Sequence, residues 1–491
     1  MKNRLLYIFI FVLGLGFTAC ETSLDINDDP NNPTEATIGL VFPAAQASLT
    51  TQVSGQLFNL GGFFSQYWDQ SPEAGQYLDL SNYKLDTESF QTFFDEAYSG
   101  GLNDLQYVLD KAEATGDWGN YLAATVVRAY YFQLLVDLYD EVPYTEALKG
   151  TEFIFPKYDK GEDVYNGIIA ELDVALAKDF SGQTVTSKDL FFEGDLQAWI
   201  QFANSLKLKI ATRAGNTALV NQLLTTPNFI TKNVGLNSSV YSQEQNKRNP
   251  WYETNVSRLS GDGDYSINHV ASHNFILYLQ TKNDPRINTL FFPSVTTGNH
   301  NGNYFGSSKL AAERKADKRD DFSTVKIEQT HPSYIMLVSE VLLLQAEGYA
   351  RAGDYAKAKS VYDQAVNASF ELHGLDGASA LLASGGSYEF TATNLTDALE
   401  QIMMQKYVCL AHFNNIEAWF EHNRTGYPKI SPVPAKDATY VPGEFTSPVD
   451  NKLGDGRFPH RLYYTDSEVS SNPNTPEQIN DITIKVWWDN N

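Results

Sequence analysis

Cysteine is nearly absent from this chain, which has two such residues, Cys20 and Cys409, among 491. Neither belongs to a CxxC motif, the usual sequence mark of a zinc or dithiol site. Histidine is also sparse, with eight residues and no dense His/Cys cluster. The sequence therefore does not support a transition-metal site, and we expect neither a metal nor a cofactor.

The motifs of several large enzyme classes are missing as well. The chain has no H-E-x-x-H, no G-x-S-x-G, no P-loop and no G-x-G-x-x-G, which mark zinc proteases, serine hydrolases, nucleotide hydrolases and dinucleotide-binding enzymes. Its 60 acidic residues place some carboxylates close together by chance, but sequence cannot set two at glycosidase spacing. We expect a protein that is not an enzyme, with a glycoside hydrolase as the weakest alternative.

Basic residues are few relative to acidic ones. Lys and Arg number 36 against 60 Asp and Glu, which gives a formal net charge of −24. A surface of this sign repels nucleic-acid phosphates and anionic lipid headgroups. Nucleic acid is therefore not an expected partner, and any membrane contact should come from a lipid anchor alone.

The first twenty residues have the pattern of an export signal. Lys2 and Arg4 precede a run of apolar residues and glycine that ends at Phe17, and small residues and Cys20 follow. This order is typical of a secretory signal, and the run falls short of the about 20 apolar residues that a membrane span needs. The ending resembles the lipobox of bacterial lipoproteins, so we expect a signal peptide over residues 1–19 and lipid attachment at Cys20. An ordinary cleaved signal or a short anchor is the alternative.

The chain after the signal divides into a tether and one domain. Residues 20–36 are polar, acidic and broken by Pro30 and Pro33, a composition typical of a solvated linker. We expect a single domain over residues 37–491. Cys409 lies in an apolar helical stretch within it, and with Cys20 acylated it has no disulfide partner. A buried, inert thiol is expected there.

Helical periodicity dominates the domain. Apolar residues recur mostly at three- and four-residue steps over residues 90–112, 121–139, 164–177, 196–214, 334–352, 355–370 and 395–422. Between residues 225 and 330 the pattern gives way to Gly, Asn, Ser and Asp with scattered aromatics, and the tail from residue 426 is irregular and proline-rich. A structureless loop of such length is uncommon in a compact domain, so short helices and tight turns are expected in the insert. The predicted fold class is all-α, or mainly α.

One helical hairpin has the pattern of a tetratricopeptide unit. Gly353 is suited to end one helix and Asp354 to begin the next. Ala358 and Tyr362 then give the A-x3-aromatic step of the repeat. One unit cannot bury its own face, so neighbouring helices should extend it. An ordinary helical hairpin is the alternative.

Several segments of the chain resemble SusD/RagB-type lipoproteins, and most closely their SusD-like branch. These segments are residues 131–147, 196–208, 283–286 (Asn-Asp-Pro-Arg), the hairpin described above, 405–428 and 458–472. Each motif is modest, but together and in this order they are specific. The resemblance runs from residue 1 to about residue 475.

The resemblance implies a fold and a function. Members are outer-membrane surface lipoproteins of Bacteroidetes-type bacteria, mostly helical, with four tetratricopeptide-like helix pairs supporting a more irregular lobe. They act as lids on TonB-dependent barrel transporters of the SusC type and bind oligosaccharides, or in some cases peptides, for import. The repeat lobe should then face the transporter, and the irregular lobe should bind ligand. A repeat scaffold that binds only protein is the further alternative.

Aromatic residues in irregular segments are the candidate glycan contacts, since flat amphipathic rings suit sugars and interfaces. The candidates are Trp68, Tyr77, Tyr83, Trp251, Tyr252, Tyr265 and Tyr304. For each of them, packing in the core is the competing interpretation.

Other conspicuous residues have simpler expected roles. Trp199 and Trp419 lie among apolar helical neighbours and are predicted core residues. Arg424 and Arg461 are expected to form buried pairs that tie the tail to the helices. Residues 261–264 (Gly-Asp-Gly-Asp) are read as a flexible acidic turn, with oxygen ligands for calcium as the alternative.

Overall fold

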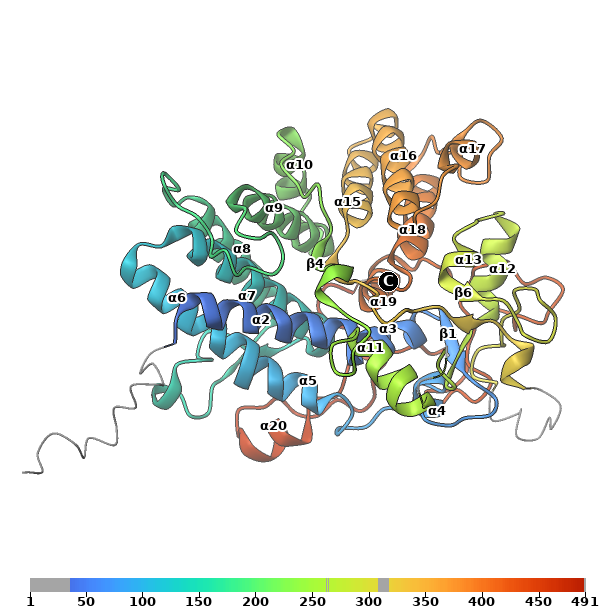
Figure 1. The fold of residues 1–491 in the computed structure, drawn as a ribbon, viewed down its shortest axis with the longest axis horizontal. Helices are drawn as coiled ribbons and strands as arrows, with labels where there is room; N and C mark the ends of the chain where they lie inside the picture. The colour runs from blue at the N-terminus through green and yellow to red at the C-terminus, as the bar shows by residue number, and fades with distance from the viewer. Residues whose placement is uncertain (1–35, 262, 264, 308–317, 490–491) are drawn as a thin grey trace, which may run out of the picture.

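The computed structural model describes residues 36–261, 263, 265–307 and 318–489. The predicted signal peptide and Cys20 lie outside these residues. Within them, none of the helices combines the length and the apolar character that crossing a bilayer requires. The chain forms two groups of helices and an irregular lobe with small sheets, which confirms the mainly α fold class (Figure 1).

A pair of N-terminal helices connects the parts of the molecule. Helix α2 (Ile38–Ser54) runs through the middle of the view and continues into α3 (Gln56–Phe64) (Figure 1). Helix α2 packs against α6 (Asn103–Thr115) and α7 (Trp118–Tyr139), whereas α3 packs against α19 (Asn415–Thr425). The two helices thus tie the first helical group to the second.

The first helical group contains the most deeply buried helix of this region, α7, whose residues are buried along nearly all of its length. Helices α5 (Gln91–Glu96) and α6 are joined by a π-helical segment, η1 (Ala97–Leu102). The segment contains Gly100 and Gly101 and divides the helical stretch predicted over residues 90–112. The Tyr131 ring packs so closely on Gly101 that a Cβ there would lie 2.1 Å from its hydroxyl oxygen. The group is completed by α8 (Gly161–Leu176), α9 (Leu196–Arg213) and α10 (Thr217–Thr225).

The second helical group contains the predicted hairpin, formed by α15 (Val338–Arg351) and α16 (Tyr355–Leu372). Gly353 has a φ of +80°, and the Asp354 side chain accepts a hydrogen bond from the Lys357 amide at 3.0 Å. Helix α15 also packs against α9 and α18 (Leu395–Leu410). The hairpin is therefore extended by neighbours on both sides, as one repeat unit requires.

Two predicted helix boundaries in this group are wrong. Residues 333–336 form a strand, β8 (Ser333–Met336), because they pair with β4 (Val234–Leu236) of the insert before α15 begins. The predicted helix over residues 395–422 is two helices, since the chain turns between α18 and α19 at His412, whose φ is +64°. Tertiary pairing and a local turn override the helical periodicity in these places.

The irregular lobe is built around a small antiparallel sheet. Its strands are β1 (Trp68–Gln70), β5 (His269–Ala271), β7 (Thr324–Val325) and β6 (Phe291–Phe292), in that order. Short helices complete the lobe, as the sequence predicts for the insert: α11 (Pro250–Tyr252), η4 (Glu253–Arg258), α12 (His273–Thr281) and α13 (Ile287–Leu290). The strands themselves were not predicted.

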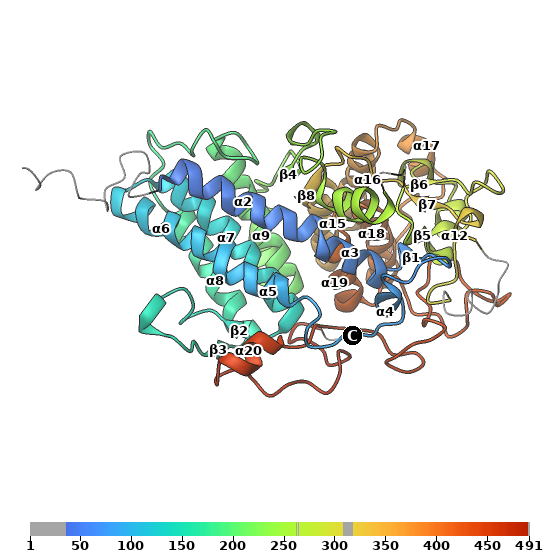
Figure 2. The same ribbon diagram turned by 60° about the horizontal axis from the view of Figure 1, so that its bottom comes forward.

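The remaining elements are short and lie in connections. They are α4 (Leu78–Ser81), β2 (Val142–Pro143), η2 (Gly150–Glu152), β3 (Tyr158–Asp159), η3 (Ser238–Val240), η5 (Arg319–Asp321), α17 (Ala378–Leu382) and α20 (Asp466–Ser471). Figure 2 shows α20 and much of the C-terminal tail running along one face of the molecule, beneath the helices. The tail therefore joins the two halves on that side.

The predicted role of Arg461 in the tail is confirmed. Its guanidinium lies 3.7 Å from a carboxylate oxygen of Asp140 and donates a hydrogen bond to the carbonyl of Tyr139, at the end of α7. The Trp419 indole donates a further bond of 3.0 Å to the carbonyl of Pro459. These contacts fix the tail against the helices.

The core residues predicted from the helical spacing are buried. Trp199 and Cys409 are completely buried and Trp419 nearly so. Burial raises the pKa of the Cys409 thiol above its ordinary value, so the group stays protonated. The prediction of a buried thiol is confirmed.

Candidate functional site

The seven aromatic candidates divide into buried and half-buried rings. Trp68 and Tyr83 are 0% exposed, Trp251 is 1% and Tyr252 is 6% exposed. Trp68, for example, packs between Phe58 and Trp251, with ring centroids 5.7 and 5.6 Å away. A ring without an open face cannot stack on a sugar in this conformation. These four side chains take the core role that was the competing interpretation for them.

Tyr77, Tyr265 and Tyr304 are half-buried, and they lie in different places. The Tyr265 ring is 5.0 Å from the Arg319 guanidinium and 6.2 Å from the Phe292 ring. Tyr304 packs on His273, with centroids 4.7 Å apart. Of the three, Tyr77 lines a cavity between described residues.

Tyr77 lies in a cleft of about 340 Å³ between the N-terminal helices and the irregular lobe. Four amide side chains give the cleft its polarity, and we call it the amide cleft. These side chains are Gln52, Gln56, Asn59 and Asn255. Rings of Tyr77, Phe90 and the edge of Trp251 contribute the apolar part of its lining.

Asn59 is held in one orientation at the floor of the amide cleft. Its Oδ1 accepts hydrogen bonds from Nε2 of His269 at 2.7 Å and from the Trp251 indole at 3.4 Å. Burial lowers the pKa of His269 to about 3, so the imidazole is neutral. The Ser266 hydroxyl lies 2.7 Å from its Nδ1, and the single ring proton therefore belongs on Nε2.

This arrangement leaves the amide nitrogen of Asn59 as the free group. Nδ2 of Asn59 donates to no acceptor within the part of the chain that the structure describes, and it is not among the fully enclosed unpaired atoms. Because Oδ1 is fixed by two ring donors, Nδ2 is available to a ligand oxygen. The floor of the cleft thus presents a positioned hydrogen-bond donor.

Tyr77 forms one wall of the amide cleft. Its hydroxyl donates to Oδ1 of Asn255 at 2.6 Å, and Nδ2 of Asn255 in turn donates to the Trp251 carbonyl at 3.1 Å. The Tyr77 amide donates to Oε1 of Gln70 at 2.7 Å. Burial raises the pKa of Tyr77 to about 12, so the phenol keeps its proton and the wall keeps its geometry at neutral pH.

Two glutamines form a further part of the lining. Nε2 of Gln56 donates to Oε1 of Gln52 at 3.1 Å, and Gln52 donates to the carboxylate of Glu96. This series of hydrogen bonds leaves Oε1 of Gln56 and a carboxylate oxygen of Glu96 as acceptors. Glu96 is the only charged side chain in the lining. The cleft therefore offers donors, acceptors and ring faces without a positive charge, which suits a neutral polyhydroxylated ligand and disfavours an anion.

The four amides were not found from the sequence. Gln52, Gln56 and Asn59 are spaced as i, i+4 and i+7, which is the spacing of one face of a continuous helix, although the structure has Gln52 on α2 and the other two on α3. Polar residues repeating on one face of an otherwise apolar helical stretch are the signal that was available. Asn255 has no such signal, because it meets the others only through the tertiary fold.

The predicted acidic turn over residues 261–264 is only partly described. Asp262 and Asp264 lie outside the described residues, so its calcium alternative stays a prediction. Elsewhere in the described ranges, no three His, Cys, Asp or Glu side chains gather into a group that would hold a metal ion.

A comparison with protein families settles the relationship of the chain. Residues 30–448 match a SusD-like family model that is described as starch-binding and associating with the outer membrane. The chain belongs to the SusD-like family. Proteins of this family are binding proteins rather than enzymes, and they associate with the outer membrane. Among curated proteins, none matches this SusD-like chain in sequence.

Solved structures of the same family share the fold. A SusD homologue from Bacteroides uniformis is 23% identical, with a TM-score of 0.72, over 92% of this chain and 100% of its own. A chitin-binding SusD homologue from Flavobacterium johnsoniae is 20% identical, with a TM-score of 0.71, over 92% and 98%. A further chitin-binding protein is 23% identical, with a TM-score of 0.69, over 91% and 100%. At these identities the likeness establishes the SusD-like fold alone.

Proposed function

We propose that this SusD-like protein captures a neutral oligosaccharide in the amide cleft and serves as the lid of a SusC-type, TonB-dependent transporter. The observation that carries the proposal is the fixed orientation of Asn59, whose free Nδ2 lies at the floor of a cleft lined by amides and rings. Amides that are held in place before binding lose little entropy when a sugar hydroxyl replaces water.

Membership of the family supports the choice of a glycan. The family description names starch binding, and two similar structures are of chitin-binding proteins. The absence of a basic residue from the cleft lining favours an uncharged sugar over a uronate or a sulfated glycan. Tyr77 is the candidate contact of the original seven that the proposal keeps at this site, while Tyr265 and Tyr304 remain candidates for a more extended ligand.

The proposed cellular placement combines the sequence with the family, because the lipobox alone fixes neither the leaflet nor the face. Cys20 is the proposed lipid attachment site, at the outer membrane and facing the cell surface, and residues 20–36 are the proposed tether. More than one acyl chain gives stable anchoring. The tether would let the protein tilt over its transporter without leaving it.

Two alternatives use the same features differently. A peptide-binding lid would use the same amides to bind a peptide backbone. A scaffold would bind a protein through the helix pairs around α15 and α16 and would leave the amide cleft empty.

The glycan proposal is tested by calorimetric titration of the mature protein, produced from residue 21, with neutral tetrasaccharides (N-acetyl-chito-, cello- and malto-) and tetrapeptides. Asn59→Asp retains the Oδ1 acceptor for His269 and Trp251 but replaces the free donor by an acceptor. We expect it to weaken glycan binding at least tenfold. Asn367→Asp, on the exposed side of α16, makes the same chemical change away from the cleft and should leave binding unchanged.

The outcomes separate the alternatives. Glycan binding that Asn59→Asp leaves intact would remove the cleft from the proposal, and binding of peptides in place of glycans would favour the peptide lid. Transporter pairing is tested by co-purification with the barrel protein encoded beside this gene, and absence of a complex contradicts it. Cys20→Ala should move the protein from the membrane to the soluble fraction without changing its glycan affinity.

A further inference from the structure

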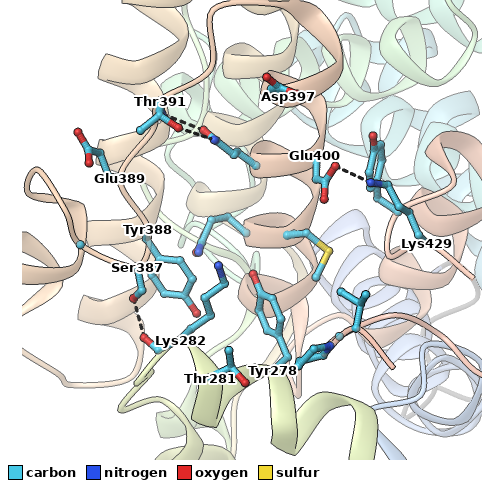
Figure 3. A pocket seen from close by; sticks show the side chains of 18 of the residues that line it. Tyr278, Thr281, Lys282, Ser387, Tyr388, Glu389, Thr391, Asp397, Glu400 and Lys429 are labelled. Carbon is cyan, nitrogen blue, oxygen red and sulfur yellow. Dashed lines mark hydrogen bonds and ion pairs between the residues drawn. The ribbon is translucent and has the colours of Figure 1, made fainter. Parts of the chain in front are cut away.

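A second cavity has a volume of about 700 Å³ and shares no residue with the amide cleft. It lies where the second helical group meets the irregular lobe, and Figure 3 shows it from close by. Helix α12 forms its lower side, and α18 and the loop after α17 line the others (Figure 3). Residues 441–444 contribute a further edge.

A buried ion pair fixes the floor of this cavity. Asp284 and Arg286, from the Asn-Asp-Pro-Arg motif, have fully buried side chains with 2.7 Å between Oδ2 and Nη2. The Tyr388 hydroxyl donates to Oδ2 of Asp284 at 2.6 Å, and Nη2 of Arg286 donates to Oε1 of Gln405 at 3.2 Å. The pair therefore positions one phenol and one amide that line the cavity.

Gln405 is left with an unused donor. Its side chain is 1% exposed, and its Nε2 has no hydrogen-bond partner among the described residues. A buried amide N–H without an acceptor is costly, and most such groups in proteins are satisfied. Gln405 lines the cavity, but its Nε2 is fully enclosed by neighbouring atoms, so a ligand does not reach this donor in the present conformation.

Two further phenols in the lining have unused hydroxyls. Tyr278 and Tyr362 are buried, and neither hydroxyl bonds to another group in the described ranges. Burial raises the pKa of both above the ordinary value, so each stays protonated and can donate or accept. Figure 3 shows the Tyr278 and Tyr388 rings projecting into the same space from different elements.

The rim adds charged groups with an excess of carboxylates. Lys429 is paired with Glu400 at 2.7 Å, and Lys282 is the other cation of the lining. The carboxylates of the lining are Glu389, Asp397, Glu400 and Glu444. Four carboxylates and two ammonium groups leave a net charge of −2. This sign disfavours an anionic ligand.

We infer that this cavity is a second ligand site, separate from the amide cleft, and that it takes a short uncharged oligosaccharide. Among the lining tyrosines, Tyr427 is half-buried and offers a ring face to a sugar. Tyr278 and Tyr362 provide donors in the lining, and the rim carboxylates accept from ligand hydroxyls. The volume lies within the range of pockets that hold small organic ligands. The site does not depend on the amide cleft, and either one can bind without the other.

The test removes the two unused hydroxyls and retains the rings. Tyr278→Phe/Tyr362→Phe deletes no hydrogen bond within the described structure, so the melting temperature should stay unchanged. Each lost hydroxyl should weaken binding in the cavity about 2- to 10-fold. Tyr349→Phe/Tyr355→Phe, on the α15–α16 hairpin that also carries Tyr362 but outside the lining, is the matched control. Calorimetric titration uses the neutral tetrasaccharides named above, with tetragalacturonate as the anionic probe.

The expected result is two equivalents of a neutral tetrasaccharide per wild-type chain. Tyr278→Phe/Tyr362→Phe should weaken one of them, Asn59→Asp should weaken the other, and the control should change neither. A single equivalent that only Asn59→Asp weakens overturns the second site and leaves the proposed function standing. A single equivalent that only Tyr278→Phe/Tyr362→Phe weakens overturns the amide cleft as a binding site and leaves the second site standing. Tetragalacturonate binding that the tyrosine pair weakens overturns the uncharged class, and no binding of any sugar overturns both proposals.

Discussion

Arg424 on α19 and Glu347 on α15 form a buried ion pair with two parallel hydrogen bonds, of 2.8 Å to one carboxylate oxygen and 2.6 Å to the other. The Glu347 side chain is fully buried. Arg424 also lies 2.6 Å from Glu421, which is 3.0 Å from Lys406 on α18. The pair predicted from the sequence for Arg424 is therefore one part of a larger network.

The network joins five helices through buried charges. Lys209 on α9 lies 2.7 Å from Glu417 and 3.3 Å from Glu340, and Arg213 pairs with Asp137 and Glu417. Buried charges are stable only while each has its partners. Removing one partner leaves the other charge buried and unpaired, so the protein loses more stability than the intact pair contributes. The network thus fixes how α7, α9, α15, α18 and α19 sit against one another.

Glu347→Gln should destabilise the protein by about 3–5 kcal/mol, the usual cost of breaking a buried pair. The substitution removes the charge that Arg424 faces but keeps the volume of the side chain. Urea unfolding at pH 7 measures the effect. Glu244→Gln, in an exposed pair with Lys247, is the control and should change the unfolding free energy by less than about 1 kcal/mol. Equal effects of the two substitutions would contradict the role given to the network.

Asp69 should give the stability a pH dependence of its own. Its carboxylate is fully buried on β1, where Nδ2 of Asn303 donates to it at 2.9 Å and the Gly306 amide at 3.2 Å. Among the described residues it forms no ion pair with a cation. Burial raises the pKa of Asp69 from 3.8 to about 7, although the hydrogen bonds lower it in part.

The sign follows from the raised pKa. The folded protein holds the Asp69 proton more tightly than the unfolded chain. The contribution of this proton to the unfolding free energy is therefore fully present below pH 3.8 and is lost as the pH rises to about 7. Asp69→Asn removes the titration. The unfolding free energy of the wild type minus that of Asp69→Asn should therefore fall between pH 4 and 7 and be constant above about pH 8. Urea unfolding from pH 4.5 to 8.5 measures it, and a difference that rises with pH would refute the assignment.

Taking the difference between the two proteins is necessary because buried histidines titrate in the opposite sense. Burial lowers the pKa of His269 and His373 to about 3 and that of His331 to about 4. These groups remove stability as the pH falls below their ordinary value of 6.5. Their contribution is common to the wild type and Asp69→Asn and cancels.

The helical architecture was predictable from the sequence because helices of this length carry their own periodicity. The hairpin at Gly353 and Asp354 is an example, since the turn and cap residues are local signals. Strand β8 was missed because its partner β4 is about a hundred residues away, and a strand of four residues has too few positions to show a pattern. Local signals fail where pairing at long range decides the structure.

The candidate sites were less predictable than the fold. Of the aromatic candidates in loops, Tyr77 lines the amide cleft, whereas Trp68 and Trp251 fill the core around His269. Sequence does not distinguish a ring that faces solvent from one that packs on a distant strand. Gln405 shows the same limit, because its Oε1 accepts a hydrogen bond from Arg286 across 119 positions of the chain. Sequence does not show such a contact.

Gly61→Ala should destabilise the contact between α3 and α19. A Cβ at Gly61 would lie 2.3 Å from the backbone carbon of Asn415 and from the nitrogen of Ile416. Backbone cannot rotate away as a side chain does, so we expect a loss of about 1–3 kcal/mol or more. Gly100→Ala is the control because nothing lies within 4 Å of its Cβ position, and it should be neutral or slightly stabilising. Urea unfolding of both variants is the measurement, and a neutral Gly61→Ala would contradict the close approach.

Cys409 should report global unfolding. The thiol is fully buried, with Nη1 of Arg286 at 3.8 Å from its sulfur, and burial raises its pKa. A protonated thiol without solvent access does not react with maleimide. In the mature protein produced from residue 21, whose single cysteine is Cys409, we expect no labelling at pH 7 in buffer and one label per chain in concentrated urea, counted by mass spectrometry. Across a urea series, labelling should rise at the same midpoint as the loss of helical circular dichroism. Labelling of the folded protein, or an earlier midpoint, would mean that α18 opens before the rest of the chain unfolds.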